Sequence, residues 1–232
     1  MAATEKGVWD LQDVRDKQLA SEWDYTEIYE LYSWGTNGSG ELGHNSTQSR
    51  SSPMQVPGTT WSSTSHSRSN GIFGTKTDGT LWSWGASGYG YGGRNSQASM
   101  SSPIQLPGTN WSTGDNGHIN GHDFSLMTRT DGTMWAAGRN NQGQLWQNDK
   151  RDRSSPTQIG GEDGWSAVSG CYNSSMALRT DGTIWSWGNN GYGQIGQTNV
   201  YGNFSSPVQI PGTWVDAGFN GGGNLVFALK TT

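Results

Sequence analysis

The sequence predicts an all-β protein built from four repeated units of about 50 residues each. Three observations lead to this prediction. Glycine contributes 36 of the 232 residues, about twice its usual share of ~7%. Only 31% of the residues are apolar, yet 13 are tryptophan, so the core must be built from a few large aromatic side chains. Short aromatic runs alternate with turn residues from residue 31 onward, which is typical of strands.

Four landmarks recur in the same order along the chain. Each unit has an aromatic strand, a Gly-rich segment that ends in Ser-Ser-Pro, a lone tryptophan, and a strand that leads to Thr-Asp-Gly-Thr. The aromatic strands are LYSWG (31–35), LWSWG (81–85), MWAAG (134–138) and IWSWG (184–188), and the lone tryptophans are Trp61, Trp111, Trp165 and Trp214. The Ser-Ser-Pro prolines at positions 53, 103, 156 and 207 are 50, 53 and 51 residues apart. This spacing predicts four copies of one supersecondary unit.

Each landmark has a physical reason. Side chains alternate between the two faces of a strand, so Trp82 and Trp84 share one face of the strand at 81–85. Ser-Ser-Pro fits a strand entry, where proline removes no hydrogen-bond donor that the sheet needs, and the short Val/Ile/Leu runs after it supply another strand. Asp-Gly inside Thr-Asp-Gly-Thr predicts a two-residue hairpin with positive φ at both central residues.

About four short strands per unit are too few to fold alone, whereas stacking the units around an axis buries their faces, as in a β-propeller. The pattern formed by LWSWG, the Gly-rich segment, SSP, the lone Trp and TDGT resembles the repeat of the regulator of chromosome condensation family. The resemblance implies four-stranded blades, and the best-known members have seven of them. Here it implies a four-bladed propeller over residues 28–232. Residues 141–146 (NQGQLW) depart from the pattern, because Trp146 stands where a glycine is expected, so we expect that loop to be remodelled.

The two ends of the repeat region suggest how a ring could close. The first unit begins at its aromatic strand, and the last ends at residues 227–232, where Thr-Asp-Gly-Thr would begin. Pairing the N-terminal strand (28–34) with the C-terminal strand would complete a fourth blade and protect two strand edges. We therefore expect a closed ring. The alternative is an open arc that closes only with copies in other subunits.

Residues 1–27 lie outside the repeat and form an N-terminal arm. Good helix formers without Gly or Pro predict a short helix from Asp10, or from Gly7, to about Trp23. The arm either packs on its own propeller or docks on a partner, since its apolar residues resemble interface anchors. These are Trp9, Leu11, Val14, Leu19 and Trp23. Residues 6–23 (KGVWDLQDVRDKQLASEW) resemble the opening of virion structural proteins of tailed bacteriophages, which implies a virion component attached by this arm.

No cofactor or metal is expected. Residues 191–196 (GYGQIG) fit the dinucleotide fingerprint G-x-G-x-x-G, but the residues after them are not helix-forming, and the pattern recurs at 38–43 and 88–93, so it belongs to the repeat. The single cysteine, Cys171, excludes an intramolecular disulfide and a Cys-based zinc cluster and is expected to be a small core residue. His118 and His122 have i,i+4 spacing, but the glycines beside them argue against a helix that would present both to a metal.

The sequence also gives no sign of catalysis, nucleic-acid binding or membrane insertion. Asp78, Asp131 and Asp181 have the same turn role, whereas an acid–base pair needs two different environments, and no G-x-S-x-G motif is present. The net charge is −5 and the basic residues are scattered, which disfavours nucleic acid. No apolar run approaches the ~18 residues of a membrane span, and no signal peptide begins the chain.

We therefore expect a non-enzymatic structural and interaction protein, a tail- or appendage-associated part of a bacteriophage virion. Its partners would be other virion proteins, copies of itself, or a host-surface protein or glycan. The alternative is a free-standing carbohydrate- or protein-binding propeller in the cytoplasm. The candidate contact residues in the variable loops are Tyr89, Tyr91, Arg94, Arg139, Trp146, Arg151, Tyr192 and Tyr201.

Overall fold

The computed structural model describes residues 29–66, 69–113, 118–161, 163–197, 201–219 and 224–230. These residues form sixteen β-strands in antiparallel sheets, and no helix occurs among them, which confirms the all-β prediction. The predicted arm helix and its five apolar residues lie outside the described residues. Within the described part of the chain there is also no helix that is long and apolar enough to span a membrane.

Three complete sheets have four strands each, in the order in which the strands follow along the chain. The first contains β3 (Trp61–His66), β4 (Gly71–Lys76), β5 (Leu81–Gly85) and β6 (Met100–Gln105); the second contains β7 (His118–Asn120), β8 (Phe124–Thr128), β9 (Met134–Gly138) and β10 (Arg153–Ile159); the third contains β11 (Trp165–Cys171), β12 (Ser174–Arg179), β13 (Ile184–Asn189) and β14 (Asn203–Ile210). The aromatic strands are therefore the third strands of their sheets, and the Ser-Ser-Pro segments lie in the fourth.

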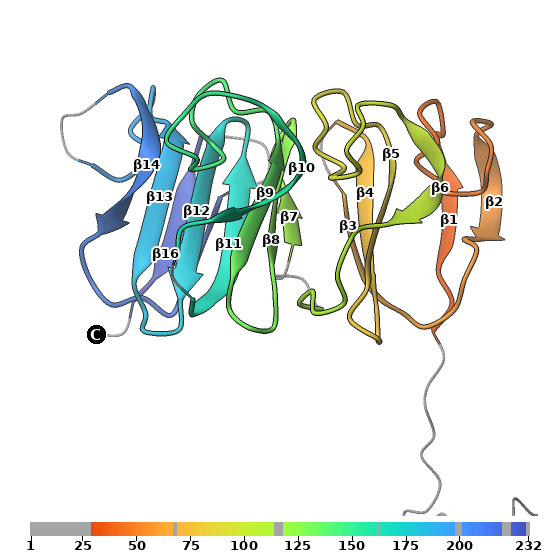
Figure 1. Ribbon diagram of the computed structural model, residues 1–232, viewed down its shortest axis with the longest axis horizontal. Helices are drawn as coiled ribbons and strands as arrows, with labels where there is room; N and C mark the ends of the chain where they lie inside the picture. The colour runs from red at the N-terminus through yellow and green to blue at the C-terminus, as the bar shows by residue number, and fades with distance from the viewer. Residues whose placement is uncertain are drawn as a thin grey trace, which may run out of the picture.

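A two-stranded sheet lies at each end of this row. β1 (Tyr32–Gly35) pairs with β2 (Arg50–Gln55), and β15 (Asp216–Phe219) pairs with β16 (Val226–Leu229). Among the described residues β1 and β16 do not pair, and Figure 1 shows their sheets at opposite ends of the molecule. The expected pairing of the two terminal strands is therefore not seen among the described residues, where β1 and β16 belong to separate sheets.

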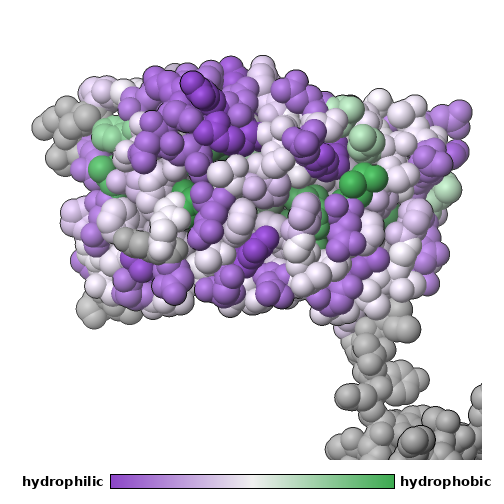
Figure 2. All heavy atoms as spheres, in the orientation of Figure 1, coloured by the Kyte–Doolittle hydropathy of each residue, from purple (hydrophilic) through white to green (hydrophobic). Residues whose placement is uncertain are grey.

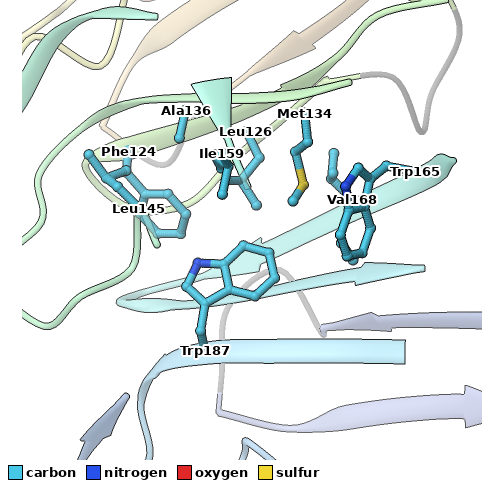
Figure 3. Packing of buried hydrophobic residues seen from close by; sticks show 10 residues of the cluster. Phe124, Leu126, Met134, Ala136, Leu145, Ile159, Trp165, Val168 and Trp187 are labelled. Atoms are coloured by element: carbon cyan, nitrogen blue, oxygen red, sulfur yellow. The ribbon is translucent and has the colours of Figure 1, made fainter. Parts of the chain in front are cut away.

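Successive sheets stack face to face through their first strands and share apolar cores. β3 contacts β7, β7 contacts β11, and β11 contacts β15. The largest core cluster fills the space between the second and third sheets, and it is shown in Figure 3. There, Phe124 and Leu126 of β8 face Trp165 of β11 and Trp187 of β13, and all four are buried. Cys171 is buried, as expected of a small core residue.

The same packing repeats between the other sheets. Trp111 of the second sheet packs on Phe73 and Leu81 of the first. Trp61 and Trp84 of the first sheet pack on Val56, which follows β2. Each lone tryptophan of the repeat up to Trp165 therefore fills the space between its own sheet and the preceding one. This is why a chain with few apolar residues can bury a continuous core.

The Asp-Gly turns differ from the prediction. Only the glycine has positive φ, with values of 77°, 80° and 81° at Gly79, Gly132 and Gly182. The Lys76 N–H donates to the Thr80 carbonyl, so the loop contains three residues rather than two. The aspartate has another role: Asp78 Oδ1 accepts hydrogen bonds from both the backbone N–H and the hydroxyl of Thr80, at 2.9 and 2.7 Å. The prediction of positive φ at both central residues was wrong, because the side chain of Asp78 closes the turn.

The Gly-rich loops are tight turns, and among the described residues they are followed by strands and not by the helix of a strand–turn–helix dinucleotide motif. The predicted remodelling of the third loop was wrong. The Trp146 N–H donates to the Gly143 carbonyl at 3.1 Å, as Gly43 does to Gly40 and Gly196 to Gly193. Trp146 also has a positive φ, as those glycines do.

Candidate interaction surface at the loop end

The stacked sheets have two chemically different ends. The pairs Gly71–Gly85, Phe124–Gly138 and Ser174–Gly188 place the turns before β4, β8 and β12 at the same end as the long loops after β5, β9 and β13. We call this the loop end. The opposite end, with the Asp-Gly turns, is the hairpin end. Figure 2 shows strongly hydrophilic residues gathered at the loop end, over the long loop between β9 and β10.

Exposed large hydrophobic side chains occur in three places on the described surface. The tyrosines at the loop end are Tyr89, Tyr172, Tyr192 and Tyr201. A second set lies around β1 and β2 and contains Tyr29, Tyr32, Trp34 and Met54, and a third lies around β15 and β16 and contains Val215, Leu225, Phe227 and Leu229. Ile104 on β6 stands apart from these sets. The loop end is therefore rich in exposed tyrosine, the residue type that is enriched in protein interfaces.

Three of the predicted contact residues are packing residues instead. Tyr91 is 1% exposed, and its hydroxyl donates to the Ser69 carbonyl. The Arg94 guanidinium donates to the carbonyls of Gly85 and Ala98, and its burial lowers the pKa of Arg94 to about 10. The Trp146 ring packs against Trp165 and Trp187, with ring centroids 5.8 and 5.3 Å away. Tyr91 is thus buried, whereas Arg94 and Trp146 are half-buried and engaged in contacts within the chain.

The other five predicted residues remain accessible at the loop end. The Arg139 guanidinium lies over the Tyr89 ring, with its central carbon 4.9 Å from the ring centroid, so the structure brings these two together. Arg151 is exposed in the loop between β9 and β10. Tyr192 and Tyr201 are 78% and 76% exposed in the loop between β13 and β14.

A cluster that the sequence analysis missed lies beside Tyr89 and Arg139. The Asp123 carboxylate accepts hydrogen bonds from Ser69 Oγ at 2.8 Å and from an Arg139 nitrogen at 3.2 Å. His122 Nδ1 lies 2.9 Å from the same carboxylate. The His122 ring stacks on Tyr172, with centroids 5.0 Å apart. We call this set the Asp123 cluster; it joins turns and loops of all three complete sheets and consists of Ser69, Tyr89, His122, Asp123, Arg139 and Tyr172.

A signal for this cluster was present in the sequence. In the register of the sheets, Asp123 precedes β8 as Asn70 precedes β4 and Asn173 precedes β12. The carbonyls of all three residues accept an equivalent hydrogen bond from the start of the following loop, at 3.0, 2.8 and 2.9 Å for Asn70, Asp123 and Asn173. An aspartate at an otherwise asparagine position adds a charge without changing the backbone role.

The charge of Asp123 is stabilised by its neighbours. Burial by itself raises the pKa of this carboxyl group, but hydrogen bonds from His122 and Ser69, the His122 charge and the Arg139 hydrogen bond outweigh it and hold the pKa below its usual value. The side chain of Asp123 is only 11% exposed, whereas those of His122 and Arg139 are 38% and 30% exposed. The cluster thus presents a cationic and aromatic rim around a buried anion.

The arrangement is suited to binding rather than to nucleophilic catalysis. The Ser69 hydroxyl faces two acceptors, Asp123 Oδ1 and the His122 carbonyl, so its proton is directed away from the imidazole. A serine nucleophile needs a base that receives this proton. No group of three or more His, Cys, Asp or Glu side chains able to hold a metal ion occurs in the described ranges. The Tyr89 and Tyr172 rings lie against Arg139 and His122, and both of these side chains contact the Asp123 carboxylate.

Comparison with known families assigns the chain. The model of the "Regulator of chromosome condensation (RCC1) repeat" matches residues 30–64, 131–178 and 181–229, and a second model with this description matches residues 166–194. Together these segments cover more than half of the chain. The protein therefore belongs to the RCC1 repeat family, as its landmarks indicated. No curated protein matches the sequence.

Solved propellers of this family have the same fold. Human WBSCR16 is 21% identical with a TM-score of 0.67, over 82% of this chain and 52% of its own. Prp20p of Saccharomyces cerevisiae is 18% identical with a TM-score of 0.70, over 88% and 52%. Yeast RCC1 (Prp20) in its complex with Kap60 is 17% identical with a TM-score of 0.71, over 88% and 50%. The chain spans about half the length of these relatives.

Proposed function

We propose that this protein is a non-enzymatic interaction protein that binds a protein partner through its loop end. The observation that carries the proposal is the group of exposed tyrosines there, of which Tyr89 lies against the guanidinium of Arg139 and Tyr172 against the imidazole of His122. Tyrosine rings held in place by neighbouring groups lose little conformational freedom on binding, so they are effective interface anchors.

Protein binding also agrees with the relatives. One solved structure contains Prp20 bound to Kap60, and another concerns the binding properties of Prp20p to Gsp1p and histones. These relatives share the fold at low identity, so they support the class of function, a propeller that presents loops to proteins, and do not identify the partner.

We further propose that the protein is a component of a bacteriophage virion, attached by residues 1–27. The resemblance of residues 6–23 to the opening of phage virion proteins supports this assignment. The position of Tyr29 is compatible with it. The Tyr29 carbonyl accepts the Trp61 N–H, as the carbonyls of Gly79, Gly132 and Gly182 accept equivalent bonds at the hairpin end. The described chain therefore begins at the hairpin end, and attachment through the residues before it would leave the loop end facing outward.

The virion part is tested by fractionation of particles. Phage particles from the source culture are purified on a density gradient, and peptides of this chain are quantified against those of the major capsid protein. We expect a constant ratio across the particle peak. Recovery of the chain only among soluble proteins at the top of the gradient would overturn virion attachment and favour the free-standing binding propeller.

The binding part is tested with the fluorescently labelled full chain on cells of the phage's host, by flow cytometry. We expect saturable binding that Tyr89→Ala together with Tyr192→Ala weakens about tenfold or more, as anchors do. Ile104→Ala is the matched control, since it removes an exposed apolar side chain from the outer strand β6. Equal binding by the double variant and the control would exclude the loop end as the binding surface.

A further inference from the structure

The two ends of the arc are complementary to each other. We propose that two copies of this chain join end to end, with β16 of each copy pairing with β1 of the other, to form a closed ring of eight four-stranded sheets. This inference goes beyond the proposed function, because it concerns how the fold itself is completed. It is carried by the strand positions, the exposed side chains and the packing inside the chain.

The terminal strands occupy neighbouring positions of the sheet. β15 and β16 correspond to the first and second strands of a complete sheet, since β15 contacts β11 as β11 contacts β7. β1 and β2 correspond to the third and fourth strands, since β1 carries the aromatic landmark and β2 carries Ser-Ser-Pro. If β16 of one copy lies beside β1 of the other, the strands β15, β16, β1 and β2 stand as first, second, third and fourth strand. This is the strand order of each complete sheet.

The register of this junction can be derived from the complete sheets. Three equivalent pairs between second and third strands are Gly74–Trp82, Met127–Trp135 and Ala177–Trp185. Each unit has a cation at the end of its second strand, and this cation is Arg179 in the third complete sheet and Lys230 in the last unit. Ala177 lies two residues before Arg179, and Ala228 lies two residues before Lys230, so Ala228 is the equivalent of Ala177. Tyr32 is the equivalent of Trp185 in the aromatic landmark. The expected cross-chain pair is therefore Ala228 with Tyr32.

Side chains that are buried in the complete sheets are exposed at both ends. Trp34 is 59% exposed, whereas the equivalent Trp84 and Trp187 are 2% and 0% exposed. Phe227 is 66% exposed, whereas the equivalent Phe73 is 1% exposed. Large exposed apolar side chains on unpaired strand edges are a site of association with another chain.

A binding position for Trp34 already exists at the other end. Trp84 Nε1 donates to the Glu41 carbonyl and Trp187 Nε1 donates to the Gln144 carbonyl, both at 2.8 Å. Each of these carbonyls lies in the Gly-rich loop of the unit before that of the tryptophan. The equivalent carbonyl for Trp34 is that of Gln194. Gln194 bonds Asn224 at 3.3 Å as Gln144 bonds Asn173 at 3.3 Å, so the last loop is arranged like the loop that receives Trp187.

A groove marks the place for the first strand of the other copy. It has a volume of about 250 Å³ and lies beside β3, between the segment 29–31 and residues 61–64. Inside the chain each first strand contacts the first strand of the next sheet, as β3 contacts β7. β15 of a second copy would therefore lie along β3 there.

A second copy fits this junction better than the chain's own end does. Figure 1 shows β1 and β16 at opposite ends of the row. Closing one chain on itself would open the aromatic packing between the sheets, which holds the arc in its present curvature. End-to-end contacts between two such arcs can close without leaving free ends.

Disulfide cross-linking tests the junction directly. Two full chains with different affinity tags are prepared, one with Tyr32→Cys and the other with Ala228→Cys, then mixed and oxidised. Paired strand residues have the Cα separation that a disulfide needs. We expect a covalent product that contains both tags. Tyr32→Cys mixed with Tyr192→Cys, whose cysteine lies at the loop end, is the matched control and should give no such product.

The doubly substituted chain separates the two modes of closure. With Tyr32→Cys and Ala228→Cys in one molecule, the proposal predicts covalently linked chains on a non-reducing gel. A product of single-chain mass without free thiols at these positions would show closure within one chain and overturn the proposal. Free thiols at both positions after oxidation would show that the strands do not meet, and would overturn it as well.

The mass of the full chain in solution provides the second measurement. Light scattering should give twice the mass of one chain, and Phe227→Glu should reduce it to one chain with an unchanged circular dichroism spectrum. Tyr192→Glu, at a side chain that is 78% exposed but lies at the loop end, should keep the two-chain mass. A single-chain mass for the unmodified protein, or a mass above that of two chains, would contradict the two-copy ring.

Discussion

At the scale of single residues, Trp146 and Gly160 show two coupled departures from the repeat. Trp146 has a φ of 49°, where Gly43, Gly93 and Gly196 have 73°, 68° and 74°. Its ring occupies the space beside Gly160, where a Cβ atom would lie 3.1 Å from the indole. The other three units have proline at the position of Gly160. The third unit therefore has a glycine where the other units have proline, and the Trp146 indole occupies the space beside this glycine.

We expect Trp146→Gly to destabilise the protein although it removes backbone strain. Left-handed backbone at a non-glycine residue costs about 1–2 kcal/mol, whereas removing a half-buried aromatic side chain that packs against the core costs up to about 3–5 kcal/mol. The free energy of unfolding should fall by roughly 1–4 kcal/mol, the difference between these two effects. Urea denaturation measures it, and an unchanged midpoint would show that the ring contributes no more than the strain costs.

The Asp123 carboxyl group predicts a pH dependence of stability. Its pKa is lowered in the folded state from the unfolded value of about 3.9, so its contribution is fully present above that pH and is lost as the pH falls through the folded pKa. Asp123→Asn retains the residue type of the other units but removes the charge. We expect it to lower Tm by a few degrees at pH 6 and by less at pH 3. An equal difference at both pH values would contradict the charge argument.

At the scale of the elements, each second strand ends in a cation that lies over tryptophan. Lys76 covers Trp61 and Trp82, with Nζ 5.0 and 4.6 Å from the ring centroids. The Arg129 guanidinium carbon lies 4.4 Å from the Trp111 centroid and 4.2 Å from that of Trp135. Such contacts close the hairpin end of each sheet over its aromatic core.

We expect Arg129→Met to lower the free energy of unfolding by about 1–2 kcal/mol, because it keeps an apolar stem but removes a cation over two rings. Arg129→Lys is the matched control, since lysine has this role at Lys76, and it should cost less. Thermal and urea denaturation of both variants measure the difference. Equal losses would show that packing of the arginine stem, rather than its charge, stabilises the element.

At the scale of the whole molecule, a two-copy ring couples folding to association. Completing two sheets across chains would bury Trp34 and Phe227, which one chain leaves exposed. The ends of the arc would then be stabilised only while the copies are joined. Because association stabilises the folded state by mass action, the stability should depend on protein concentration.

We expect Tm to rise as the concentration of the protein increases over about two orders of magnitude, measured by differential scanning fluorimetry and calorimetry. Phe227→Glu should show a lower Tm that does not change with concentration. A constant Tm for the unmodified protein over the whole range, with the mass of a single chain, would mean that the open arc is stable by itself.

The sequence by itself determined the features that depend on local chemistry. Strand positions follow from aromatic runs bounded by turn residues, and the predicted aromatic strands agree with the structure. The spacing of Ser-Ser-Pro predicts four units. The repeat also shows that Asp123 stands at a position where Asn70 and Asn173 stand in two other units. These features depend on residues close together in the chain, or on one unit repeated, and the sequence displays both.

Only the tertiary structure decided which loop residues are buried and which distant residues meet, because both depend on contacts between neighbouring sheets. Tyr91 is buried beside the next sheet, where Ser125 Oγ donates to the Tyr91 carbonyl, and no local pattern reports this contact. Asp123 meets Ser69 from 54 positions away, so the binding platform is visible only once the sheets are stacked. The openness of the arc likewise follows from the packing between sheets, since the curvature of a row of sheets is set by the side chains that fill the spaces between them.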